Sequence, residues 1–278
     1  MEYIDKSINE VQGDGIVKDF LAEVHAVANT YDVGHGLYDV IRFGSFAHYF
    51  HDIRNILYSE QNGRCCYCMR RLADKNKSVE HLIEKTFRPT DKWQDYMTPS
   101  TILNRKVCLE REFIKANQAN GYSKFPHSVA YQNMVLSCKG WMPDNYADSK
   151  TCNLKRQHHL VAPFVLVDTI NHDFYYKRNG FAYWDNDPHV NDPAINILKL
   201  NHNTLRMIRR IWFYAKDNHI DILKVTDRQA FLYGMLDVQI YDFDKDNTWS
   251  KMLLFLRDNY WNMLLEFDYF GTNRPNLV

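Results

Sequence analysis

Cysteines are the residues whose spacing points most directly to chemistry. Cys65 and Cys68 have the C-x2-C spacing with which two thiolates from one turn reach a single tetrahedral zinc ion, at about 2.3 Å from each sulfur. Cys138 and Cys152 could complete the set, because the segment between them is rich in loop-forming residues. The sequence therefore predicts a structural Zn²⁺ held by these four cysteines, with Cys66 left as a packing residue. The alternative is a group of ordinary buried thiols.

A glutamate and a histidine stand side by side between the two cysteine pairs, in SVEHLIEK. Glu80 offers a carboxylate, which is a natural ligand for Mg²⁺ or Mn²⁺, and the imidazole of His81 is a suitable general base at neutral pH. The flanking Val79 and Leu82 suit a short strand, which would place the two side chains on opposite faces or at a strand edge, where one can meet a metal and the other a water. An exposed strand pair without a catalytic role is the alternative.

Two asparagines add to this group. Asn153 directly follows Cys152, just inside an expected helix, where its amide oxygen would be held firmly enough to bind a metal. Asn133 precedes an apolar run and could hydrogen-bond across a hairpin to fix the loop that orients His81. Its alternative is a turn residue with no direct role.

The chain resembles the HNH, or ββα-metal, endonucleases. The residues that carry the resemblance are Cys65, Cys68, Glu80, His81, Asn133, Cys138, Cys152, Asn153 and Lys155. It implies that His81 activates a water, that Glu80 and Asn153 bind one divalent cation, and that Asn133 orients the base. Glu80 stands where the family more often has Asp. His158, little more than one turn beyond Asn153, is the alternative last ligand.

A narrower resemblance extends over about residues 60 to 212. The segments FYYKRNG and INILKLN, the latter followed by a spaced Leu and Arg, are similar to HNH proteins encoded beside ATPases in Septu-type and retron-associated anti-phage systems. This resemblance implies an ATPase subunit as partner.

The sequence predicts an α+β fold, mainly helical, in which a central zinc-braced ββα-metal (HNH) finger positions these residues. Apolar periodicity predicts an N-terminal helical cap over 1–60. The nuclease finger is expected over 61–160 with an insertion at 87–131, and a mainly helical C-terminal region over 161–278. Within that last region, aromatic-rich strands are expected on either side of Asn179-Gly180, and helices over 228–241 and 248–267.

Net charge gives no global signal for nucleic acid, because 34 Lys and Arg balance 34 Asp and Glu in the 278 residues. A DNA-binding surface must therefore be local. The expected phosphate contacts are Arg64, Arg70, Arg71, Lys155 and Arg156. For three further arginines on one expected helix, a solvated helix face is an equal alternative: these are Arg206, Arg209 and Arg210.

The chain contains no apolar run long enough for a transmembrane helix, and MEYIDKSINE lacks the features of a signal peptide. We expect a cytoplasmic protein with no membrane partner, in a reducing compartment where cysteines serve as thiols or metal ligands.

The expected function is that of a metal-dependent endonuclease that hydrolyses DNA phosphodiester bonds, as the nuclease effector of an anti-phage complex with an ATPase. A nuclease for RNA or tRNA is one alternative. A non-catalytic zinc finger that binds nucleic acid or protein is another. A zinc hydrolase is disfavoured, because four cysteine ligands leave no open position for a water.

Overall fold

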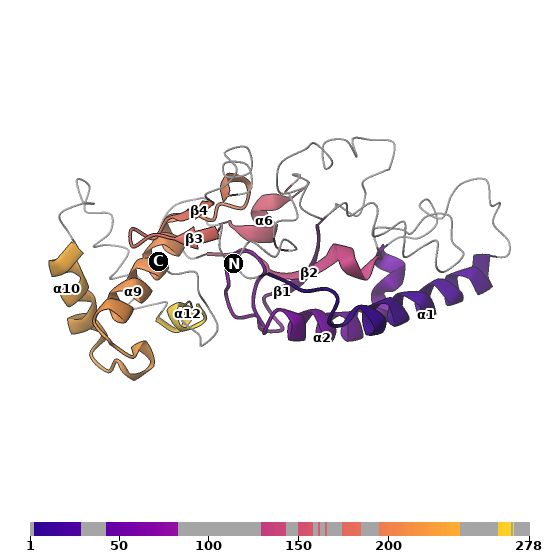
Figure 1. The fold of residues 1–278 in the computed structure, drawn as a ribbon, viewed down its shortest axis with the longest axis horizontal. Helices are drawn as coiled ribbons and strands as arrows, with labels where there is room; N and C mark the ends of the chain where they lie inside the picture. Colours follow the sequence, from indigo (N-terminus) through magenta and orange to yellow (C-terminus); the bar gives the residue numbers. More distant parts are fainter. Residues whose placement is uncertain are drawn as a thin grey trace.

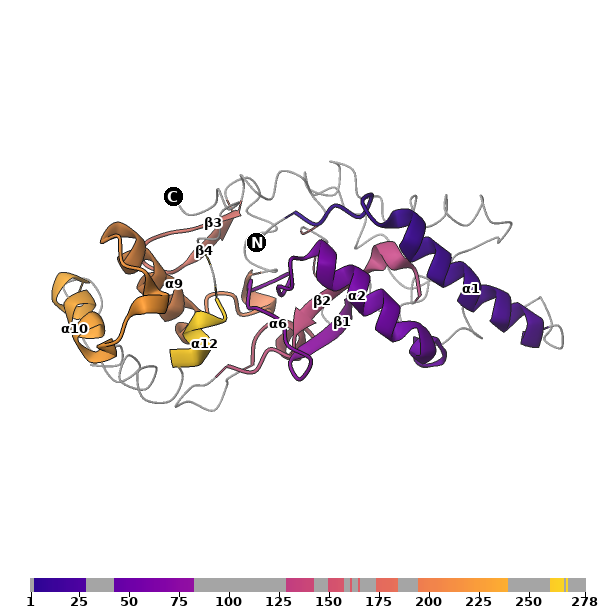
Figure 2. The ribbon, with the colours of Figure 1, turned by 90° about the horizontal axis from the view of Figure 1, so that it is seen from below.

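Two small antiparallel sheets and the helices around them form the part of the chain that the computed structural model describes. The described residues are 3–28, 43–82, 129–142, 150–157, 161, 165, 174–184, 195–239, 261–267 and 269. About half of these residues are helical, so the fold is mixed helix and strand. The structure is elongated, with helices at both ends and one sheet near the middle (Figures 1 and 2). No helix in these ranges is long and apolar enough to cross a membrane.

The N-terminal half supplies a helical layer and the first sheet. Its elements are α1 (Glu10–Ala28), η1 (Phe43–Tyr49), α2 (Phe50–Glu60), β1 (Lys77–His81), η2 (Tyr131–Asn133), β2 (Met134–Cys138) and α6 (Cys152–Arg156). The C-terminal half contains β3 (Phe174–Tyr176), β4 (Ala182–Trp184), α9 (Asn203–Asp217), η4 (Ile222–Lys224), α10 (Arg228–Gln239) and α12 (Trp261–Leu265).

The central sheet consists of β1 and β2 in antiparallel register, with Val79 opposite Leu136 and His81 opposite Met134. Every residue of β2 is buried. Its other edge is closed by the Gln61 side chain, which accepts from the Leu136 amide at 2.6 Å and donates to the Leu136 carbonyl at 2.7 Å. A glutamine at the end of α2 thus replaces a third strand and fixes β2 beneath the helical layer.

The second sheet is the hairpin that Asn179-Gly180 predicts, and this prediction is confirmed. Gly180 has φ +79°, and a Cβ there would lie 2.1 Å from the Arg206 carbonyl oxygen. The turn therefore needs glycine both for its backbone conformation and for its close approach to α9.

Two arginines of α9 fit neither of the two alternatives from the sequence, a phosphate contact or a solvated helix face. Arg209 is 1% exposed and Arg210 is 5% exposed. The Arg209 guanidinium donates to the carbonyls of Gly180 and Leu200 and lies 4.3 Å from the centre of the Tyr176 ring. It is a core residue, because the hairpin covers the face of α9 that periodicity alone leaves open.

The last described segment returns to the middle of the molecule. The Arg71 amide donates to the Glu266 carbonyl, the Arg70 guanidinium pairs with the Glu266 carboxylate, and the Tyr269 hydroxyl donates to the Cys68 carbonyl at 3.1 Å. The C-terminal region is thus packed against the cysteine-bearing turn. The expected helix over 248–267 is described only in α12, and most of the 87–131 insertion lies outside the described residues.

Candidate metal centre and the adjoining polar cluster

Four cysteines from three separate segments meet at one point. Cys65 and Cys68 lie in the turn after α2, Cys138 ends β2, and Cys152 begins α6. The turn closes through hydrogen bonds between Cys65 and the two residues beyond Cys68, with Met69 at φ 67°. We call this turn, with the ends of β2 and α6, the cysteine knuckle.

The four sulfur atoms all lie within 4.8 Å of one another, and all four cysteines are 0% exposed. The Cys65 and Cys152 sulfurs are 4.0 Å apart, and those of Cys68 and Cys138 are 3.6 Å apart. Tetrahedral coordination at a Zn–S distance of about 2.3 Å requires sulfurs about 3.8 Å apart. The cluster that the sequence predicts is therefore formed, and it could hold a metal such as zinc.

Cys66 lies outside this cluster, as the sequence predicts. It is buried beside the ligands, and its amide donates to the Leu136 carbonyl at 3.0 Å. Its role in the described structure is to fasten the knuckle turn to β2.

The long connection between Cys138 and Cys152 closes at its base. The Thr151 amide and hydroxyl both donate to the Gly140 carbonyl, at 2.7 and 3.2 Å. Gly140 has φ +79°, and a Cβ at this position would lie 1.8 Å from the Thr151 carbonyl oxygen. This close approach, which only glycine permits, returns Cys152 to Cys138.

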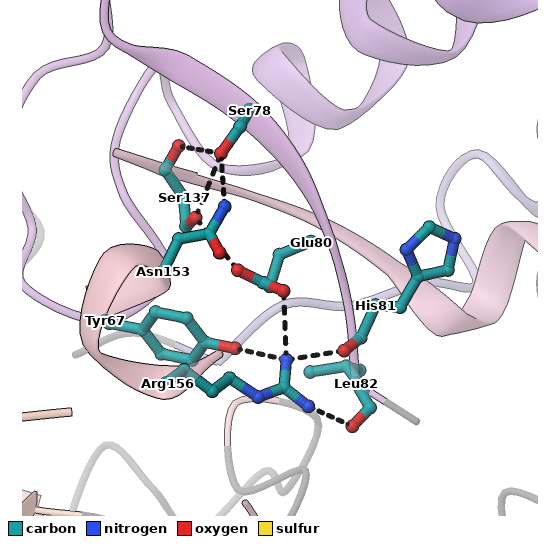
Figure 3. Close-up of polar contacts among 8 residues, drawn as sticks. All are labelled: Tyr67, Ser78, Glu80, His81, Leu82, Ser137, Asn153 and Arg156. Carbon is teal, nitrogen blue, oxygen red and sulfur yellow. Dashed lines mark hydrogen bonds and ion pairs between the residues drawn. The ribbon is translucent and has the colours of Figure 1, made fainter. Parts of the chain in front are cut away.

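A polar cluster adjoins the knuckle on one face of the central hairpin. Ser78 and Glu80 share that face of β1, because side chains alternate along a strand. The Asn153 amide donates to the Ser78 hydroxyl at 2.8 Å, and the Ser137 hydroxyl donates to the Glu80 carboxylate at 3.4 Å. Figure 3 shows these four side chains gathered on one side of the hairpin. The structure thus brings Glu80 and Asn153 into one cluster.

Arg156 fills the base of this cluster. It is 2% exposed, its guanidinium donates to the carbonyls of His81 and Leu82 and to the Tyr67 hydroxyl, and it lies 3.3 Å from the Glu80 carboxylate. The expected phosphate contact at Arg156 is corrected to an internal brace, because the hairpin end and the knuckle surround the guanidinium. Burial raises the pKa of Glu80, and the Arg156 charge opposes that rise.

His81 lies on the other face of β1. Its ring points away from Glu80 in Figure 3, and the residue is 6% exposed. Asn133 is fully buried at the end of η2, directly before β2, and its carbonyl accepts from the Leu82 amide at 2.9 Å. Asn133 therefore holds the chain directly after His81 by its backbone, and the role of its side chain in orienting the imidazole stays a prediction.

The remaining candidate residues are spread around the knuckle. Arg71 is exposed, Arg64 and Lys155 are half-buried, and Arg70 is paired with Glu266. His158 lies outside the described residues.

Sequence reasoning missed Tyr67, Ser78 and Ser137 as members of the site. The two-residue spacing of Ser78 and Glu80 on a strand was the signal for Ser78. Only the strand register identifies Ser137, because it lies directly opposite Ser78.

Comparison of the chain with models of known protein families gives no match, and a search of curated proteins gives none either. The function must therefore be argued from the cysteine knuckle and the polar cluster themselves.

Proposed function

We propose that the protein is a metal-dependent HNH-type endonuclease that hydrolyses phosphodiester bonds of DNA. The observation that carries the proposal is that Glu80 and Asn153 lie in one polar cluster on one face of the β1–β2 sheet, linked through the hydroxyls of Ser78 and Ser137, with α6 joined directly to the cysteine knuckle. A carboxylate and an amide at the junction of a two-stranded sheet and a helix are the ligand types and the arrangement that the resemblance to HNH nucleases implies.

The cysteine knuckle has a structural role, and the polar cluster has the catalytic one. Four thiolates complete a tetrahedral zinc site, so this metal is structural and leaves no open position for chemistry. Because Cys152 is one of its ligands, the knuckle also fixes the start of α6 and hence the position of Asn153. The reaction is assigned to the residues beside it.

In the proposed reaction, Glu80 and the Asn153 amide oxygen would hold one Mg²⁺ or Mn²⁺ ion, with His158 as the alternative to Asn153. Such a cation stabilises negative charge that develops on the phosphate and on the leaving oxygen. His81, whose ring lies on the other face of β1, would take a proton from the attacking water once movement of the chain brings the ring toward the cation, and Asn133 would position His81. Arg156 lies against Glu80, so it shares the carboxylate with the cation or moves away from it.

Glu80 and His81 are both buried, at 9% and 6% exposed. A phosphate therefore reaches them only after a movement of the surrounding chain. This closed state agrees with a nuclease that is restrained until a partner acts on it. We propose an ATPase subunit in the cytoplasm as that partner, as the effector role in anti-phage defence implies.

The test is plasmid nicking by the purified protein with Mg²⁺ or Mn²⁺, alone and with the neighbouring ATPase. We expect His81→Ala to lower the rate by about 10² to 10⁴, the range for loss of a general base. His51→Ala is the matched control, because His51 is an exposed histidine on α2. Wild-type nicking by His81→Ala protein would remove His81 from the mechanism.

A non-catalytic zinc-finger module is the second candidate, and the ion pair between Arg156 and Glu80 favours it. In this case the carboxylate serves packing alone, and the protein binds nucleic acid or another protein. Zinc-loaded protein that cleaves neither DNA nor RNA with Mg²⁺ or Mn²⁺, with or without the ATPase, would establish this candidate. Cleavage of RNA or tRNA alone would instead identify a ribonuclease.

A further inference from the structure

The segments that form the cysteine knuckle carry charge of one sign. Residues 64–72, 138–142 and 150–157 together contain seven Arg and Lys residues and no Asp or Glu. The whole chain is balanced at 34 to 34, so this excess is local. Carboxylates from other segments neutralise two of the seven, Arg70 and Arg156.

Three of these cations are exposed at the rim of the knuckle, namely Arg71, Lys139 and Lys150. Lys150 is paired across an isolated antiparallel bridge with Trp141, and Lys139 precedes Trp141 by two residues. Arg71 follows Arg70, whose guanidinium donates to the Trp141 carbonyl at 3.1 Å. Each exposed cation is thus close to Trp141 along the backbone, across the bridge or beside the residue that binds its carbonyl, and we call Trp141, Arg71, Lys139 and Lys150 the knuckle rim.

Trp141 is 52% exposed, although the residues on either side of it are buried. Its backbone is held by the bridge to Lys150 and by the hydrogen bond from Arg70. A large indole presented to solvent on a fixed backbone leaves much apolar surface in contact with water. Exposed aromatic residues beside cations are typical of surfaces that bind a partner.

We propose that the knuckle rim binds single-stranded DNA, with Trp141 stacked on a base and Arg71, Lys139 and Lys150 in contact with phosphates. Stacking on an aromatic ring needs an unpaired base, and a strand with one phosphate per nucleotide matches three exposed cations beside which the described residues place one carboxylate, Glu266, already paired with Arg70. The surface deepens the proposed function and rests on it for the choice of DNA. Lys150 lies three residues before Asn153 in sequence, which links the rim to the polar cluster through the start of α6.

The first experiment measures binding of a fluorescein-labelled oligo(dT) strand by anisotropy, without divalent cations. Trp141→Ala should weaken binding by about fivefold to a hundredfold, the range for loss of one stacked base, and Trp141→Phe should retain most of the affinity. Tyr233→Ala is the matched control, because Tyr233 is an aromatic residue 47% exposed on α10. Equal zinc content and circular dichroism establish that the variants are folded.

The second experiment measures the salt dependence of the same binding. Lys150→Ser should reduce the slope of log K against log salt by about 0.7, the value for one phosphate contact on a single strand. Lys224→Ser is the control, because Lys224 is exposed at 84% on η4, away from the knuckle in sequence. An unchanged slope for Lys150→Ser would contradict a phosphate contact at this position.

Four results would overturn the proposal: no binding of single-stranded DNA by the wild type, equal or tighter binding of duplex, tighter binding of RNA of the same sequence, or unaltered binding by Trp141→Ala. Equal losses in Trp141→Ala and Tyr233→Ala would also contradict it. Because the assay contains no divalent cation, its outcome does not depend on whether Glu80 and His81 cleave DNA. Failure of the binding proposal can therefore be distinguished from failure of the proposed nuclease activity.

Discussion

Replacing one thiol of the cysteine knuckle tests the metal centre most directly. Cys68→Ser removes a ligand whose sulfur lies 3.6 Å from that of Cys138. We expect the wild type to carry a single zinc ion per chain and Cys68→Ser to lose it. The matched control is Cys66→Ser, because Cys66 is equally buried in the same turn but lies outside the cluster.

The expected effect is large because a zinc ion held by these four cysteines would join three segments. Structural zinc contributes about 10 to 16 kcal/mol to the folding of small metal-dependent modules, as much as the whole stability of a typical domain, about 5 to 15 kcal/mol. Unfolding of the knuckle should also weaken the packing of the C-terminal region against it. The Tyr269 hydroxyl donates to the Cys68 carbonyl, and the Cys152 amide donates to the Leu198 carbonyl. Cys66→Ser should cost only about 1 to 3 kcal/mol, for burying a hydroxyl.

The assay is zinc content by mass spectrometry together with chemical unfolding followed by circular dichroism. We expect full zinc and a modest loss of stability for Cys66→Ser, and loss of both zinc and a folded knuckle for Cys68→Ser. Metal-free wild type that is stably folded would refute the metal centre. Equal zinc loss in the two variants would refute the assignment of ligands.

Two further predictions concern stability, both measured by chemical unfolding. Lys6→Met breaks the 2.8 Å pair with Glu60, whose side chain is 1% exposed, and should cost about 3 to 5 kcal/mol. Burial raises the pKa of Glu60 and the Lys6 charge opposes that rise, so in Lys6→Met the folded protein binds a proton at Glu60 more readily than the unfolded protein does. The loss of unfolding free energy relative to the wild type should therefore shrink as the pH falls from 7. A loss that does not change with pH would contradict this. In α1, the Cβ of Gly15→Ala would meet no atom within 4 Å, and this variant should stabilise the protein by about 0.5 to 1 kcal/mol because alanine favours a helix. A Cβ on Gly13 would lie 2.3 Å from the Tyr131 ring, so Gly13→Ala should destabilise the protein by about 1 to 3 kcal/mol. Equal changes in stability for Gly13→Ala and Gly15→Ala would contradict a steric clash with the Tyr131 ring.

Local patterns account for the features that sequence reasoning predicted correctly. The C-x2-C spacing of Cys65 and Cys68 is set by the reach of one turn, and Asn179-Gly180 specifies a tight hairpin by its backbone preferences. The grouping of Cys138 with Cys152 was inferable because a loop-rich connection can close on itself, as it does at Gly140.

The sequence predictions that the structure corrects concern residues whose surroundings are formed by segments distant in the chain. Arg156 and Arg209 both carry charge on helices, and their sequence neighbours give no sign that they are buried. Arg156 is enclosed by the end of β1 and by Tyr67, and Arg209 by the β3–β4 hairpin and Leu200. A buried guanidinium is tolerated only where carbonyls and aromatic rings surround it, and these arrive by tertiary packing.

The sequence by itself determined which residues can bind metal and which segments become hairpin, turn and helix, because spacing and backbone preference act over a few residues. Strand alternation already predicted that Glu80 and His81 face opposite ways, but only the tertiary structure decided that Glu80 shares a cluster with Asn153 and pairs with Arg156. It also decided that Trp141 stands exposed at the knuckle rim. The physical reason is that strand register and the closure of the knuckle bring together residues far apart in the chain, and burial and charge pairing depend on those neighbours.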